Sequence, residues 1–221
     1  MGDQSFENTE RALRAELAQS YRYLVQLGLN ELASGNLSAR VDDGMLISAS
    51  GATAQTITED TLVHVTTDGT WDPTGPAPSS EWQMHLEVYL RNEAAKAIAH
   101  THSDSCVALA SHGLALPGFT YVVGFLGGTD VPCVPYSTFG TAQLAADVAA
   151  ALTDRNACLL ANHGMVAHGE SVEAAVSAAH RVEILCRQYL LARRIGEPRL
   201  LTDEEWTEFF AQMARLDYGE H

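Results

Sequence analysis

Residues 97–104 read AIAHTHSD, a stretch in which a short apolar strand ends and a helix begins. Side chains two positions apart on a strand point to the same face, so we expect His100 and His102 to project together from the end of this strand. Two neighbouring imidazoles repel each other when both are protonated. A divalent metal ion is one candidate for what holds them neutral.

Outward from this stretch, helices alternate with strands along the chain. Apolar spacing and polar caps predict helices over residues 9–33, 79–96, 103–112, 142–152, 171–195 and 202–213. Short apolar runs predict strands over residues 37–41, 45–48, 63–67, 97–102, 131–135 and 157–161. The Asp42-Asp43-Gly44 turn is typical of a hairpin, so antiparallel pairing is mixed into the alternation. We therefore expect one α/β domain over residues 1–221, with three α/β/α layers and a central, mostly antiparallel or mixed sheet.

The composition argues against two classes of binding partner. Thirteen lysines and arginines against 28 acidic residues give a net charge of −15, which argues against a nucleic-acid partner and against an anionic membrane surface. The first residues, MGDQSFENTERALRAE, carry charge where a signal peptide needs an apolar core, and no segment approaches the roughly 20 apolar residues of a membrane span. Four separated cysteines without a CxxC pair are typical of a reduced protein. We expect a cytoplasmic protein.

A third histidine, His163, lies in the polar turn ANHG directly after the strand expected over residues 157–161. Zinc commonly takes three protein ligands and keeps a fourth position for water or substrate, so three imidazoles at strand ends suit a catalytic zinc site. The alternative is that each histidine is a hydrogen-bonded structural residue or that the cluster holds a structural zinc. The single lysine of the chain, Lys96, leaves little room for a mechanism that needs a Schiff-base lysine and a second lysine.

The stretch Ser79-Ser80-Glu81 indicates a second candidate site, one that would bind an anion at the start of a helix. We expect a helix to begin at Ser79 or Ser80, with Gln83 completing a capping box and Glu81 in its first turn, where the helix dipole by itself favours an acidic residue. Two hydroxyls and the free backbone N–H groups of a helix start also suit an anion such as phosphate. Further amides for such a nest are offered by the turns at Gly35, Asn36, Ser50 and Gly51.

Six motifs occur in order: GNLSAR, ISASG, PSSEWQMHLEVY, AIAHTHSDSC, PCVPYSTFGT and LLANHGMVAHG. Together they resemble the class II aldolase/adducin family, and within it the zinc-dependent L-fuculose-1-phosphate aldolases, over roughly residues 16–218. The resemblance implies one zinc ion per subunit, held by His100, His102 and His163. It implies that Glu81 is a fourth ligand in the resting enzyme and an acid/base when substrate displaces it. It further implies that phosphate of a ketose is bound by Asn36, Ser50, Gly51, Ser79 and Ser80.

The same resemblance implies a homotetramer with active sites at subunit interfaces. Tyr121 matches the family's proton donor on the aldehyde side, reaching the site from a neighbouring subunit, and Tyr218 matches a second tyrosine that closes over it. The implied reaction is reversible cleavage of L-fuculose 1-phosphate, or of a 5-deoxy or 5-substituted ribulose 1-phosphate, into dihydroxyacetone phosphate and a small aldehyde.

Three alternatives stay open within the family. An L-ribulose-5-phosphate 4-epimerase and a methylthioribulose-phosphate dehydratase use a similar metal site, although the epimerases usually carry aspartate at the position of Glu81. An adducin-type scaffold domain shares the fold without a complete set of zinc ligands, and the three histidines argue against that reading.

Overall fold

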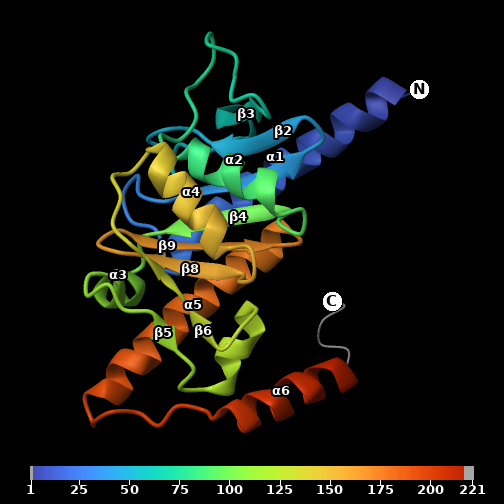
Figure 1. Cartoon of the computed structure of the whole chain (residues 1–221). Helices are drawn as coiled ribbons and strands as arrows, with labels where there is room; N and C mark the ends of the chain where they lie inside the picture. The colour runs from blue at the N-terminus through green and yellow to red at the C-terminus, as the bar shows by residue number, and fades with distance from the viewer. Residues whose placement is uncertain (1, 217–221) are drawn as a thin grey trace.

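A seven-stranded sheet forms the centre of the molecule in the computed structural model, which describes residues 2–216, with side chains from residue 9 (Figure 1). The strand order is β3-β2-β1-β4-β9-β8-β7. Neighbouring strands are antiparallel except β7 and β8, which are parallel, so the expected mostly antiparallel, mixed sheet is confirmed. The strands are β1 Asn36–Val41, β2 Gly44–Ser48, β3 Leu62–Thr66, β4 Ala97–Thr101, β7 Cys133–Val134, β8 Ala157–Leu160 and β9 Gly164–Gly169.

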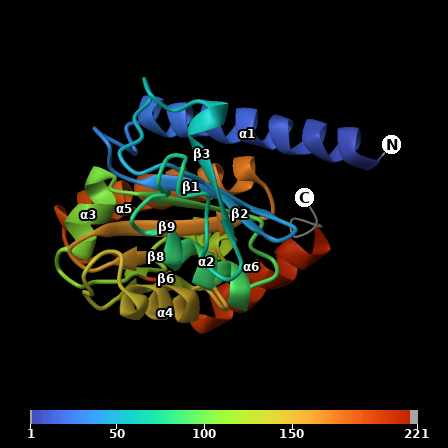
Figure 2. The same cartoon turned by 90° about the horizontal axis from the view of Figure 1, so that it is seen from above.

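Helices cover both faces of this sheet. The helices are α1 Gly2–Gln26, α2 Trp82–Arg91, α3 Asp104–Ala110, α4 Ala142–Ala151, α5 Val172–Arg193 and α6 Asp203–Arg215. One buried apolar cluster joins the sheet to α1, α3 and α5, and a second joins its other face to α2 and α4. Figure 2 shows α1 and α4 on opposite sides of the strands. The expected three α/β/α layers are therefore present.

Alternate side chains of strand β4 pack against the helical layers on the two opposite faces of the sheet. Ala97 and Ala99 pack in the cluster with α1 and α5, whereas Ile98 packs in the cluster with α2 and α4. Because side chains alternate along a strand, His100 lies on the same face as Ile98 and points toward α2. The small alanines on the other face allow α5 to pack closely against β4.

Helix α2 begins later than the sequence predicts. Its first residue is Trp82 and its N-cap is Glu81, so the capping box with Gln83 is not formed. The backbone N–H of Ser79 donates to Ser48 O, and residue 78 bridges to residue 49, so this segment is held extended beside the end of β2. A segment that pairs with a strand end cannot also start a helix.

Two other segments differ from expectation. The strand predicted over residues 131–135 is divided at Pro132, which has no N–H to donate. Its first part, β6 Asp130–Val131, pairs with β5 Leu116–Pro117 in a separate two-stranded sheet, and its second part is the edge strand β7. Strand β9 was not predicted from the sequence. The 3-10 helices are η1 Glu59–Thr61 and η2 Tyr121–Leu126.

Within residues 2–216, no helix combines the length and the apolar character that crossing a membrane requires.

Candidate active site

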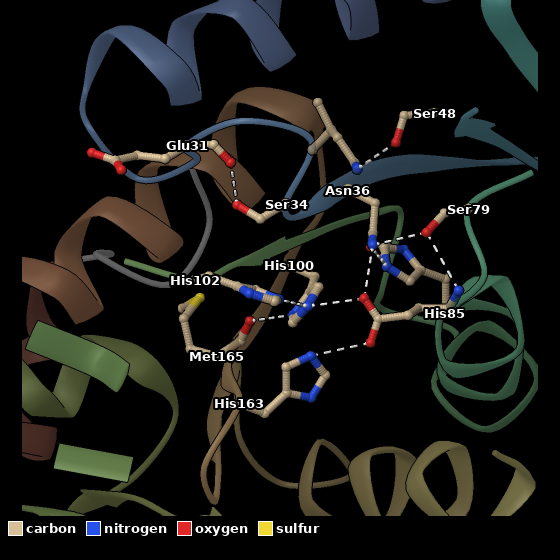
Figure 3. Close-up of polar contacts among 12 residues, drawn as sticks. Glu31, Ser34, Asn36, Ser48, Ser79, His85, His100, His102, His163 and Met165 are labelled. Atoms are coloured by element: carbon tan, nitrogen blue, oxygen red, sulfur yellow. Dashed lines mark hydrogen bonds and ion pairs between the residues drawn. The ribbon is translucent and has the colours of Figure 1, made fainter. Parts of the chain in front are cut away.

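Four potential metal ligands meet at one end of β4. His100 lies near the end of that strand, His102 follows it, His163 occupies the turn between β8 and β9, and Glu81 precedes α2. One ligand atom from each of the four lies within 4.8 Å of the others. Figure 3 shows the three imidazoles converging, with dashed contacts to a carboxylate. The structure thus brings together the residues that the motifs single out.

The β8–β9 turn places His163 through an unusual backbone. Asn162 has a φ of 56°, in the left-handed region where asparagine is better tolerated than most residues. Gly164 lies against β4, since a Cβ there would stand 2.4 Å from the carbonyl oxygen of Thr101. A larger residue at position 164 would push the turn away from His102.

The ligand atoms make close contacts with one another. His100 Nε2 lies 2.9 Å from His102 Nε2 and 3.1 Å from Glu81 Oε2. His163 Nε2 lies 3.3 Å from Glu81 Oε1. His100 Nδ1 donates to the backbone oxygen of Met165 at 2.8 Å, which leaves the lone pair of a neutral His100 on Nε2, facing the other ligands.

The buried carboxylate controls the charge of the cluster. Burial favours the neutral form of Glu81, but His100 and His163 more than offset this and hold its pKa well below the usual range. Burial also opposes a charge on His100, yet Glu81 and the Met165 carbonyl raise its pKa. Burial and the two neighbouring imidazoles lower the pKa of His102 to about 3. The cluster therefore contains a Glu81–His100 ion pair beside a neutral His102.

This donor set fits a divalent cation. Three imidazole nitrogens and one carboxylate suit zinc, whose ligand atoms about 2.0–2.2 Å from the ion stand about 3.4 Å apart. Glu81 Oε1 is buried and, among the described residues, accepts no hydrogen bond besides its ion pair with His163. A buried oxygen that lacks a donor is better satisfied by a cation.

A pocket of about 340 Å³ opens over the cluster. All five residues expected to bind phosphate line it, namely Asn36, Ser50, Gly51, Ser79 and Ser80. Ser80 is exposed, whereas Asn36 is buried and its amide donates to Ser79 Oγ and Glu81 Oε2. Whether these residues bind phosphate remains a prediction.

Of the two predicted tyrosines, the structure describes Tyr121, which lies away from the pocket. Tyr121 is 55% exposed at the start of η2, packs against Phe125 and Phe209, and is not among the residues that line the pocket of the described chain. A role at this pocket would require a second subunit. Tyr218 lies outside the described residues.

Sequence reasoning missed two side chains that line the pocket, Tyr136 and Phe139. The motif PCVPYSTFGT contains both without a pattern that assigns them a role. For His85, which lies four residues after Glu81, the sequence predicts a packing or hydrogen-bonding role. The structure confirms this, since His85 is fully buried and hydrogen-bonded to Asn36.

Comparison with known proteins gives the chain its family. A family model described as the class II aldolase and adducin N-terminal domain matches residues 15–190. The chain belongs to this class II aldolase and adducin family. The class II aldolases of this family are metal-dependent, and the cluster of three histidines and one glutamate described above could bind a metal ion.

Class II aldolases are similar to the chain over most of its length. The 5-methylthioribulose-1-phosphate/5-deoxyribulose-1-phosphate aldolase of Rhodospirillum rubrum is 40% identical over 195 residues, covering 88% of this chain and 87% of that protein. The L-fuculose phosphate aldolase of Escherichia coli is 39% identical over 183 residues, covering 82% and 85%. A solved L-fuculose 1-phosphate aldolase aligns with a TM-score of 0.87 and 33% identity, over 92% of this chain and 96% of that one. These similarities identify the chain as a class II aldolase, a lyase.

Proposed function

We propose that this aldolase is zinc-dependent and reversibly cleaves a ketose 1-phosphate into dihydroxyacetone phosphate and a small aldehyde. Its relatives are named as aldolases of L-fuculose phosphate and of 5-methylthioribulose 1-phosphate and 5-deoxyribulose 1-phosphate, so we propose L-fuculose 1-phosphate or a 5-deoxy or 5-substituted ribulose 1-phosphate as the substrate. The observation that carries the proposal is the convergence of three imidazoles and one carboxylate at the base of a pocket whose walls include exposed serine.

The metal would be held by His100, His102, His163 and, in the resting enzyme, Glu81. Bound there, the ion would withdraw electrons from the substrate carbonyl, which is the Lewis-acid contribution that carbon–carbon cleavage needs. The alternative electron sink, a Schiff-base lysine, has no candidate in the pocket of the described chain. Lys96, the single lysine, is exposed and precedes β4, whereas His100 lies near the other end of that strand.

Glu81 is the residue we assign to proton transfer on the three-carbon fragment. Its carboxylate lies at the base of the pocket, and among the described residues Oε1 is buried with only the His163 imidazole beside it, at 3.3 Å. Its other lone pairs are therefore open to a proton of the substrate. The hydroxyls of Ser79 and Ser80 and the turn at Ser50-Gly51, which line the same pocket, would bind the phosphate. Asn36 would join them through its position between Ser79 and Glu81.

A neighbouring subunit completes the proposed site. Tyr121 from the adjacent protomer of a homotetramer would take the proton of the aldehyde-side hydroxyl in cleavage and return it in condensation, and Tyr218 would close over the substrate. The exposure of Tyr121 and its distance from the pocket of its own chain support this assignment. A cytoplasmic location is proposed with it, in agreement with four free cysteines.

The direct test is a substrate screen. Purified protein would be offered fuculose, rhamnulose, ribulose and 5-substituted ribulose 1-phosphates, with triose-phosphate release coupled to a dehydrogenase. We expect triose phosphate from at least one of them and loss of activity after zinc removal by a chelator, restored by zinc. Activity that survives complete metal removal would refute the zinc mechanism.

An L-ribulose-5-phosphate 4-epimerase is the second candidate. Such epimerases use a similar metal site but usually carry aspartate at the position of Glu81. Incubation with L-ribulose 5-phosphate distinguishes them. Accumulation of D-xylulose 5-phosphate without dihydroxyacetone phosphate would replace the aldolase proposal with the epimerase.

A further inference from the structure

A row of polar side chains runs beneath the pocket between α2 and β1. Glu81, His85 and Tyr89 are spaced by four, so they lie along one face of the helix. Asn36 and Ser38 are spaced by two, so they lie on one face of the strand. Glu81, His85, Asn36 and Ser38 are 0–7% exposed and lie beside the apolar cluster between the sheet and helices α2 and α4.

These residues form one continuous chain of hydrogen bonds. Tyr89 Oη lies 2.8 Å from Ser38 Oγ, and Ser38 Oγ lies 2.7 Å from His85 Nδ1. His85 Nε2 lies 2.5 Å from Asn36 Oδ1, and Asn36 Nδ2 lies 3.1 Å from Glu81 Oε2. The chain ends at the carboxylate that the proposed mechanism uses.

The carboxylate determines the direction of every bond. An ionised Glu81 only accepts, so the Asn36 amide must present its NH2 group to Glu81 and its oxygen to His85. His85 must then carry its proton on Nε2 and accept at Nδ1. The hydroxyl of Ser38 donates to that nitrogen and in turn accepts from Tyr89. Every bond of this row then joins one donor to one acceptor, and a reversal at any point would place two acceptors against each other.

We propose that His85 is a positioning residue that acts through Asn36 to fix the orientation of the Glu81 carboxylate. The proposal rests on the function assigned above, because orientation of Glu81 affects turnover only if Glu81 transfers a proton. A buried imidazole suits this role because its rigid ring connects the Ser38 hydroxyl to the Asn36 side-chain amide, both of which lie on β1.

The surroundings keep this arrangement fixed. Burial and the nearby charge of His100 lower the pKa of His85 to about 3, although Glu81 opposes this. Burial also raises the pKa of Tyr89 above its ordinary value. Both groups therefore stay neutral near pH 7, and the hydrogen-bond directions do not change with protonation.

The first experiment reads the tautomer of His85 without using activity. In metal-free protein labelled with 15N-histidine, the His85 signals are assigned from their absence in His85→Gln. We expect a neutral imidazole with the proton on Nε2 in the wild type and also in Ser38→Ala, because Asn36 Oδ1 still accepts from Nε2 when the donor to Nδ1 is removed. A wild-type imidazole with its proton on Nδ1, or a shift of the proton to Nδ1 in Ser38→Ala, would overturn the proposal.

The second experiment compares three zinc-loaded variants. His85→Leu removes the donor to Asn36, and we expect kcat to fall about 10–100-fold with full zinc content and little change in KM. His85→Gln keeps an N–H donor and should recover kcat to within a few-fold of the wild type. Val88→Ala is the control, since Val88 is fully buried in the same helix but outside the chain of hydrogen bonds. It should lose stability while keeping kcat.

The outcomes separate positioning from packing. Equal losses of kcat in His85→Gln and His85→Leu, or an equal loss in Val88→Ala, would show that His85 only packs. If His85→Leu does not fold, His85→Gln and the Ser38→Ala spectrum still decide the matter. A wild-type protein that cleaves no ketose 1-phosphate would refute the proposed function, whereas the tautomer measurement would be unaffected.

Discussion

His100 Nε2 lies 3.1 Å from Glu81 Oε2, so two residues proposed to bind the same cation also form a buried ion pair with each other. A zinc ion bound as proposed would compete with this pair for both side chains. Its binding would exchange the ion pair and one proton for metal–ligand bonds.

This exchange predicts that zinc affinity depends on pH. The Glu81 carboxylate raises the pKa of His100, and zinc needs the unprotonated Nε2, so the affinity should fall about tenfold per pH unit on the acid side of that pKa. His102, whose pKa is about 3, releases no proton near neutrality. Competition with a chromophoric chelator from about pH 6 to about pH 9 measures the slope. A flat profile would contradict the ion pair.

The same raised pKa affects the stability of the metal-free protein. A histidine whose pKa is raised by folding stabilises the fold fully below its unfolded pKa, and the contribution disappears as pH rises through the folded value. The free energy of unfolding measured in urea should therefore include the contribution of the Glu81–His100 pair in mildly acidic solution. In alkaline solution this contribution should be absent. Glu81→Gln is the matched variant, and its stability should lack this dependence on pH.

Replacement of a histidine ligand should abolish function without unfolding the protein. His102 lies beyond the end of β4 at the edge of the pocket, so His102→Ala removes a ligand without opening a cavity in either apolar layer. We expect a folded variant with zinc affinity lowered by more than about 100-fold, since even outer-sphere changes cost 10–100-fold. Metal analysis, circular dichroism and triose-phosphate release measure the three quantities. His112→Ala, an exposed histidine outside the pocket, should behave as the wild type.

The phosphate assignment predicts an effect on KM that depends on the substrate. Ser80 is exposed at the pocket wall and lies next to the buried Ser79. Ser80→Ala should raise KM for a ketose 1-phosphate about tenfold, because a hydrogen bond to a charged group contributes about 1.5–3 kcal/mol. The small residual cleavage of the unphosphorylated ketose should not change. An equal loss for both substrates would place Ser80 outside the phosphate site.

The glycine after His163 should be intolerant of substitution. In Gly164→Ala the new Cβ would stand 2.4 Å from the Thr101 carbonyl oxygen and 3.2 Å from the ring of His102. We expect unfolding free energy to fall by about 1–3 kcal/mol and zinc affinity to fall with it, because the His163 turn must shift. Gly75→Ala is the control, since its Cβ would meet nothing closer than 3.8 Å. Chemical denaturation and zinc titration test both variants.

Local sequence patterns were sufficient to predict most of the helices and strands of this protein. The apolar periodicity predicted nearly all elements of the sheet and its helices, because the spacing of apolar residues fixes which face of each element is buried. The prediction was weakest where an element depends on its neighbours. The start of α2 was wrong because residues 78–79 pair with the end of β2, and β9 was missed because its apolar run follows directly after a histidine turn.

Residue type and local spacing were enough to show which side chains of the candidate site have the chemistry to bind a cation and an anion. Which of these side chains meet depends on the packing of the whole chain. Asn36 lies opposite His100 in the β1–β4 register, and α2 crosses that pair so that Glu81 and His85 face it. Distances between segments that far apart in the chain depend on strand order and register, which arise from packing of the whole sheet and are not encoded in any one motif.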